Sequence, residues 1–190
     1  STNMAMEVTG ASSADGAEVQ IWSYYDSESQ MKWVFEEASS VGSSIPANYE
    51  LNDSYDVRCY PFALYLNIPL NVAGYTPGDS LSKTKDLVLQ QFNAKDHPYN
   101  RSVRPISKNA NIIKDKEFKI AMAVSSKDYH FMVQCADGTW AHKLAYLNSK
   151  NLGNIDPDNL PWDYSGVDPS TGKEESAKYT EGTVYFAVRI

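Results

Sequence analysis

One cysteine and two histidines in this sequence are candidates for nucleophilic chemistry. Cys59 lies in the stretch RCYPFAL, two positions before Pro61. Proline fits only the first turn of a helix, so we expect a helix over 60–67, ended by Pro69, with Cys59 at its N-cap or first turn. Free N–H groups and the helix dipole favour a thiolate there. The residues behind Cys59 are apolar on every side, which predicts a buried helix.

Both histidines fall on a predicted β-hairpin with strands at 129–135 and 139–147. His130 lies in KDYHFMVQ and His142 lies in GTWAHKLA, with the turn sequence ADG between the strands. A three-residue loop would place the two histidines on one face of the hairpin, whereas a two-residue Asp-Gly loop would place them on opposite faces. We favour the three-residue loop, with Gly138 in a left-handed conformation.

A cysteine nucleophile requires an imidazole to accept its proton and a polar group to orient that imidazole. Cys59, His130 and His142 would fill these roles in that order. Asp156 and Asn148 are alternative groups that could orient His130 if His142 is a packing or surface residue.

The three-residue loop also bears on the second cysteine. Cys135 is five positions from His130, so its side chain would point to the other face of the strand. If Cys59 lies against His130, a Cys59–Cys135 disulfide is not expected, and Cys135 would be a buried, inert thiol.

The remaining elements follow from periodicity and turn residues. Strands are predicted at 117–124 and 183–190, where apolar residues alternate, and a surface helix is predicted at 81–92 behind Asp79 or Ser80. Two segments, 93–116 and 148–178, contain proline or turn-forming residues, and we expect no regular structure in them. The first is long enough to form a substrate-binding or lid loop.

The first 38 residues read as short strands at 4–8, 19–22 and 32–35, separated by polar turns. The stretch MAMEVTG…ADGAEVQIWSYYDSESQMKW resembles one repeat of a ricin-type β-trefoil lectin. The resemblance implies weak carbohydrate binding through Glu7, Trp22 and Gln30, with Trp22 as the aromatic platform. It also implies a partial repeat at 1–38. The segment 39–50 is rich in Ser, Gly and Pro, so we expect a linker there and a second domain at 51–190.

The motifs RCYPFAL and DYHFMVQCADGTWAHKLA resemble those of a bacterial papain-like domain of the NlpC type. Some of these cysteine peptidases use a Cys-His-His triad. The resemblance implies an α+β fold in which the helix that bears the cysteine packs on an antiparallel sheet. The oxyanion would be held by the Cys59 backbone N–H and a second donor, Tyr55 or Tyr60. A lectin repeat joined to a cysteine peptidase also resembles fungal lectin–peptidase chimeras.

Composition excludes several other classes of function. The formal charge of −7, without a basic run, argues against a nucleic-acid partner. No apolar stretch approaches the length of a membrane span. Cysteine and histidine spacings match no zinc pattern and there is no phosphate loop, so we expect no metal or cofactor.

We therefore expect a secreted or cell-surface bacterial cysteine peptidase or amidase that hydrolyses peptide or peptidoglycan amide bonds. The alternative is a non-catalytic carbohydrate-binding or adhesion module, in which Cys59 and Cys135 form a disulfide and the histidines are packing residues.

Overall fold

The computed structural model describes residues 4–12, 17–25, 31–33, 38–39, 57–93, 98–145, 147–159, 162–167 and 171–190. The chain divides into two compact units, Ser1–Glu36 and Glu37–Ile190. Of the linker expected at 39–50, only Ser39 lies within the described residues.

The first unit contains an antiparallel hairpin. β1 (Met4–Val8) pairs with β2 (Val19–Ser23), and a 3₁₀ turn, Thr9–Ala11, follows β1. The strands predicted at 4–8 and 19–22 are confirmed. The strand predicted at 32–35 is not formed at 32–33, and its other residues lie outside the described part of the chain.

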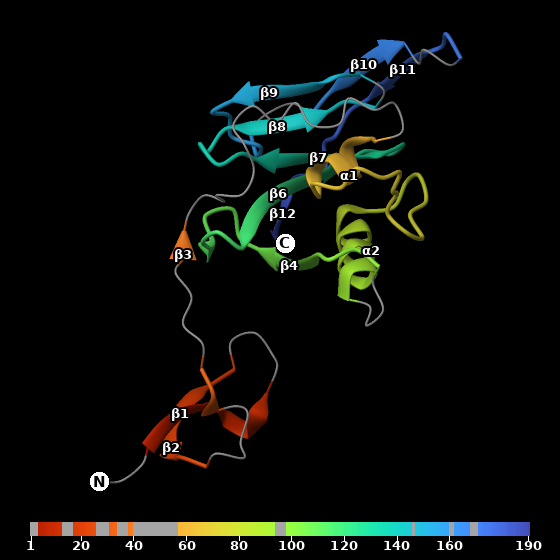
Figure 1. Cartoon of the computed structure of the whole chain (residues 1–190). Coiled ribbons are helices and arrows are strands. Elements are labelled where there is room, and N and C mark those ends of the chain that lie inside the picture. Colours follow the sequence, from red (N-terminus) through yellow and green to blue (C-terminus); the bar gives the residue numbers. More distant parts are fainter. Residues whose placement is uncertain are drawn as a thin grey trace. The chain divides into compact units, whose positions relative to one another are not determined.

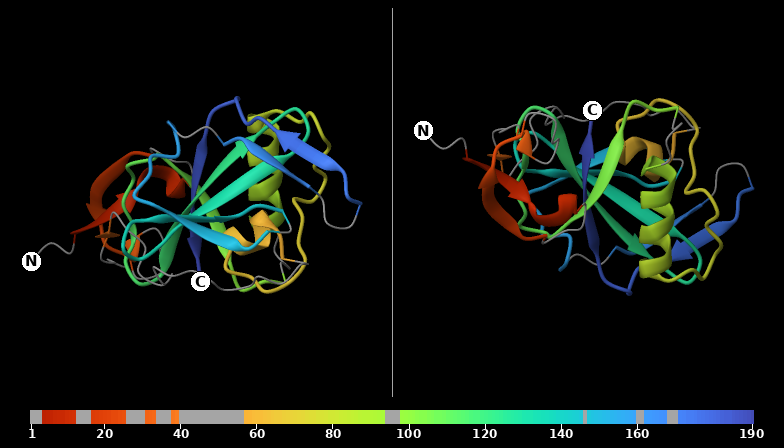
Figure 2. Two further views of the ribbon diagram at one scale, coloured as in Figure 1. Left: turned by 90° about the horizontal axis from the view of Figure 1, so that it is seen from above. Right: turned by 90° about the horizontal axis from the view of Figure 1, so that it is seen from below.

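The second unit is built on a six-stranded antiparallel sheet in the order β4-β12-β6-β7-β8-β9 (Figure 1). Its strands are β4 (Ser102–Ile106), β6 (Glu117–Val124), β7 (Tyr129–Gln134), β8 (Trp140–Lys143), β9 (Ser149–Gly153) and β12 (Val184–Arg189). The strands from β6 to β9 follow one another along the chain, and β12 then returns to the other side of β6. The twist of the sheet is visible in Figure 2.

Two short ladders accompany this sheet. β3 (Ala38–Ser39) pairs with β5 (Ile112–Ile113), and β10 (Tyr164–Val167) pairs with β11 (Glu174–Ala177). The pairing of β3 shows that the second unit begins before the segment expected to be a linker.

The core is organised around β6, all eight residues of which are buried. Alternate residues of β6 face two hydrophobic clusters. Phe118, Ile120, Met122 and Val124 belong to a first cluster that also contains buried side chains of both helices. Ala121 and Ala123 belong to a second cluster, together with Trp162 and Tyr179. Both faces of the sheet are therefore covered, which explains the near-continuous apolar character of β6.

The first helix, α1 (Cys59–Ala63), begins where Pro61 predicts, and all five of its residues are buried. It is shorter than the predicted 60–67. Tyr65 adopts a left-handed conformation with φ of 56°. The Arg101 guanidinium donates hydrogen bonds to the carbonyls of Leu64 and Tyr65, both at 3.2 Å. A distant side chain thus satisfies carbonyls at the end of the helix, which ends before Pro69.

The second helix, α2 (Leu81–Asn93), confirms the helix predicted at 81–92. Ser80 caps it, since its hydroxyl accepts a hydrogen bond from the Lys83 N–H at 3.3 Å. Val88 and Phe92 lie one turn apart and enter the first cluster.

The predicted papain-like α+β fold is wrong. The described residues form twelve strands and two α-helices. Of the two helices, only α2 is longer than five residues. The second unit is therefore mostly β. Two differences from the sequence-based expectation account for this: α1 ends early, and segments expected to be irregular contain strands.

Those segments are 93–116, which contains β4 and β5, and 148–178, which contains β9, β10 and β11. The expectation of a lid loop at 93–116 is therefore wrong for its second half. Pro105 lies within β4, an edge strand of the sheet, where its missing N–H interrupts no central ladder. Each of these strands has five or fewer residues, too few for alternation to stand out.

We expect Phe131→Ala to destabilise the second unit by about 3–5 kcal/mol, because it removes a fully buried ring from the first cluster. That ring contacts the ring of Tyr60 at a centroid distance of 4.7 Å. Urea unfolding followed by circular dichroism measures the loss. Val167→Ala, at a position 52% exposed, is the control and should change the free energy of unfolding by less than about 0.5 kcal/mol. Equal effects of the two substitutions would contradict the assigned core.

Candidate functional site

The β7–β8 hairpin has the three-residue loop that the sequence favoured. The Cys135 N–H donates to the Thr139 carbonyl at 2.7 Å, and Gly138 has a φ of 86°. In this register Met132 pairs with His142, so His142 shares a face with both Met132 and His130. The prediction that the two histidines lie on one face is confirmed.

The two imidazoles are in hydrogen-bonding contact. His130 Nε2 and His142 Nδ1 are 3.2 Å apart, and the rings meet edge to face. Only one of these nitrogens can carry the shared proton when both rings are neutral. If His130 carries it on Nε2, its Nδ1 is the nitrogen left to accept a proton, and the described contacts give Nδ1 no hydrogen bond. His142 thus occupies the place of the orienting group.

Aromatic rings surround His130. Trp162 and Tyr179 each lie 5.8 Å from it between ring centroids, and the Trp162 indole is fixed by donating to the Pro157 carbonyl at 2.7 Å. Burial, followed by the nearby His142, lowers the pKa of His130 well below its usual value. Burial, followed by the charge of Lys150, lowers the pKa of His142 to about 4. Both rings are therefore neutral near pH 7.

Sequence reasoning missed Trp162 and Tyr179. They lie in or beside turn-rich segments, and only the fold brings them to His130. In the sequence, only their aromatic residue types could have indicated a place beside His130.

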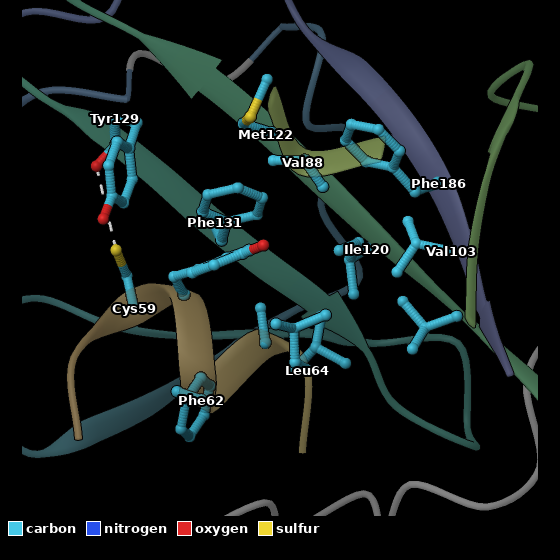
Figure 3. Packing of buried hydrophobic residues seen from close by; sticks show 14 of the residues in the cluster. Cys59, Phe62, Leu64, Val88, Val103, Ile120, Met122, Tyr129, Phe131 and Phe186 are labelled. Carbon is cyan, nitrogen blue, oxygen red and sulfur yellow. Dashed lines mark hydrogen bonds between the residues drawn. The ribbon is translucent and has the colours of Figure 1, made fainter. Parts of the chain in front are cut away.

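Cys59 is the first residue of α1 and is 7% exposed. Its sulfur points toward Tyr129 on β7 and donates a hydrogen bond of 3.8 Å to the Tyr129 carbonyl (Figure 3). Tyr129 and Phe131 belong to the first cluster, whereas His130 contacts Trp162 and Tyr179 of the second. In the described contacts no hydrogen bond joins the sulfur to either imidazole.

The expected thiolate is not favoured in this structure. Burial, followed by the negative charge of Asp128, raises the pKa of the Cys59 thiol from 9.0 to about 12. Because α1 has only five residues, its dipole does little to offset that burial. The site at rest therefore holds a neutral thiol and two neutral imidazoles.

Cys59 and His130 nevertheless line the same pocket, which has a volume of about 700 Å³. Tyr75, Tyr129 and Tyr179 supply aromatic surface, and charged residues of both signs, Arg58, Lys127, Asp128 and Glu174, also line it. A cavity of this size, lined by aromatic rings and by a few polar groups that include a thiol and an imidazole, is a candidate small-molecule or peptide site.

The other predicted catalytic residues are not brought to His130. The Tyr60 hydroxyl donates its proton to Gln91 Oε1 at 3.1 Å. This hydrogen bond does not support a role for the hydroxyl as a donor to an oxyanion. Asp156 pairs with Lys108, and Asn148 is exposed. Tyr55 lies outside the described residues.

Both cysteines are free, so the disulfide in the alternative interpretation is not formed. Cys135 is buried in the first cluster, as expected for an inert thiol.

The predicted carbohydrate-binding residues lie in the first unit. Glu7 pairs with Gln20 across the hairpin and accepts a hydrogen bond of 2.7 Å from its side chain. The Glu7 carboxylate is largely buried, whereas the ring of Trp22 is 53% exposed. Gln30 lies outside the described residues.

Within the described residues, no group of three or more His, Cys, Asp or Glu side chains could hold a metal ion. In the same residues, no helix has the length and apolar character needed to cross a bilayer.

No protein-family model, curated protein or solved structure matches this chain. The resemblances to ricin-type repeats and NlpC-type peptidases therefore stay predictions, and the geometry of the site carries the functional argument.

We expect the protein to lose stability as pH falls from about 6.5 to about 4. The unfolded chain protonates His142 in that range while the folded chain does not, so the free energy of unfolding falls with pH. His142 alone accounts for about 3 kcal/mol. His142→Gln should remove that part of the slope in urea unfolding measured at several pH values. Lys150→Gln, which removes the neighbouring charge, should reduce the slope less. Equal slopes for wild type and His142→Gln would contradict the assignment.

We expect Cys59 to react with iodoacetamide at pH 8 roughly 100- to 1000-fold more slowly than an exposed thiol, because its pKa of about 12 leaves little thiolate. The measurement uses a Cys135→Ala background and mass spectrometry. Asp128→Asn should speed labelling, since it removes the negative charge and keeps the oxygen that accepts the Tyr129 N–H. Arg58→Gln should slow it. Labelling as fast as that of a cysteine in a short peptide would contradict the burial of the thiol.

Proposed function

We propose that the second unit is a cysteine hydrolase that cleaves amide bonds in peptides or in the peptide part of peptidoglycan. One observation carries the proposal: Cys59 and His130 line one pocket, while His142 Nδ1 lies 3.2 Å from Nε2 of the His130 ring. Cys59 is the nucleophile, His130 is the general base, and His142 orients His130.

Cys59 attacks from the neutral state. The thiol turns from the Tyr129 carbonyl toward His130, and its proton passes to His130 Nδ1 as the sulfur adds to the substrate carbonyl. The resulting imidazolium donates through Nε2 to His142, which the lowered pKa keeps neutral and able to accept. Buried neutral groups thus become an ion pair only when substrate charge develops beside them.

The oxyanion lies near the start of α1. The backbone N–H groups of Cys59 and Tyr60 belong to the first turn, where no preceding helical carbonyl is available to them. They are the donors for the tetrahedral intermediate. Its collapse breaks the C–N bond, and His130 returns its proton to the leaving amine. Water, deprotonated by His130, then hydrolyses the thioester to a carboxylate and the free thiol.

The rival function is a non-catalytic carbohydrate-binding module, favoured in the first unit by the exposed Trp22. It does not explain why His130, in hydrogen-bonding contact with His142, lines the pocket of the second unit. The two functions are compatible in one chain that is secreted or attached to a cell surface.

We expect the protein to hydrolyse members of a panel of unstructured L-peptides and purified muropeptides, with Cys59→Ala abolishing turnover. His130→Gln should lower kcat/KM by about 100- to 10,000-fold, because the general base is lost. His142→Gln should lower it less, because an amide can still accept from Nε2. Mass spectrometry of the products measures all three effects.

Cys135→Ala is the matched control, since it removes the other thiol without touching the pocket. Turnover that survives in Cys59→Ala would refute the proposal. So would the absence of both turnover and labelling of Cys59 by a panel of peptide vinyl sulfones.

A further inference from the structure

Within the described residues, β10 and β11 form a two-stranded ladder whose outer edges are unpaired. β11 pairs with β10 along one edge, and no other strand in the described part of the chain pairs with its second edge. An unpaired edge presents a row of backbone N–H and C=O groups that can accept another extended chain.

β11 lies at the wall of the candidate active site. Its residues Glu174, Ser176 and Ala177 line the pocket that contains Cys59 and His130. Neighbouring residues such as Ser176 and Ala177 point to opposite faces of a strand. Their joint presence at the wall indicates that β11 meets the pocket with its edge and not with one face.

We propose that the substrate is an extended L-polypeptide that binds by adding a strand to the free edge of β11, which carries its scissile amide across the pocket to Cys59. This inference rests on the proposed hydrolase function and names its substrate class. Main-chain pairing gives affinity for many sequences, while side-chain contacts give preference. Glu174 at the edge favours a lysine or arginine in the bound peptide.

Strand addition predicts different affinities for L-polypeptides and for the stem peptides of peptidoglycan. A regular ladder requires successive L-residues linked through their main-chain amides. A stem peptide with D-residues and side-chain-linked amides cannot continue such a ladder, so we expect it to bind more weakly than an L-peptide of equal length.

Two adjacent proline substitutions test the edge. In an antiparallel pair, successive N–H groups point alternately toward the partner strand and away from it, so Ser176 and Ala177 differ in which edge they serve. Ser176→Pro and Ala177→Pro are made in the full-length Cys59→Ala protein. One should destabilise the hairpin, seen as loss of amide protection in β10. The other should keep that protection and weaken binding about 3- to 10-fold, the effect of one main-chain hydrogen bond.

The ligand is the tightest binder selected from a degenerate library of twelve-residue L-peptides, measured by fluorescence anisotropy. N-methylation of this peptide at alternate residues should weaken binding, whereas methylation at the intervening residues should not. Equal tolerance at every position, or no binding by any L-peptide, would overturn the strand-addition proposal.

The hydrolase proposal is tested separately by turnover in the protein that retains Cys59. Cleavage together with equal binding of all N-methylated peptides supports the hydrolase proposal and rejects strand addition. Binding with alternating tolerance but no cleavage supports strand addition and rejects the hydrolase.

Discussion

The contact between His130 and His142 is the interaction on which the candidate site depends. It exists because the hairpin loop contains three residues, which fixes the pairing of Met132 with His142. A loop one residue shorter would turn one ring to the opposite face. Gly138, at a φ of 86°, supplies the left-handed conformation that this loop requires. A single backbone angle in a turn therefore determines whether a base and its orienting partner can meet.

Burial determines the chemical state of the site. The same packing that holds the rings near Trp162 and Tyr179 removes water from them, so neither imidazole carries a charge at neutral pH. The Cys59 thiol, which lines the same pocket as His130, is also neutral. A resting thiolate–imidazolium pair would need a more polar environment or a longer helix behind Cys59, whereas burial is the largest influence on the pKa of both groups. In the proposed hydrolase, the charge separation must therefore be created with substrate in place.

Local rules predicted the parts of the fold that local chemistry governs. Pro61 fixed the start of α1, alternation found β6 and β12, and Asp137-Gly138 located the central turn. Long-range contacts decided the remainder. α1 ends early where Tyr65 turns left-handed, and Arg101 binds the carbonyls of Leu64 and Tyr65 there. The short strands β9 to β11 form through strand pairing that no run of apolar residues predicts. The predicted α+β class was wrong because these strands were taken as loops. Cys59 and His130 were expected in direct contact, yet the structure places them around a shared pocket.

The edge strands of the large sheet, β4 and β9, are less able than β11 to pair with another chain. β4 contains Pro105, which has no N–H to offer, and β9 contains Lys150, whose charge resists close approach of a second basic edge. Both edge strands of the sheet are thus protected against edge-to-edge pairing with another copy of the protein. Sheet-to-sheet growth between copies of the second unit is therefore disfavoured, which leaves its short ladders, β10–β11 among them, as the places where a foreign backbone can pair.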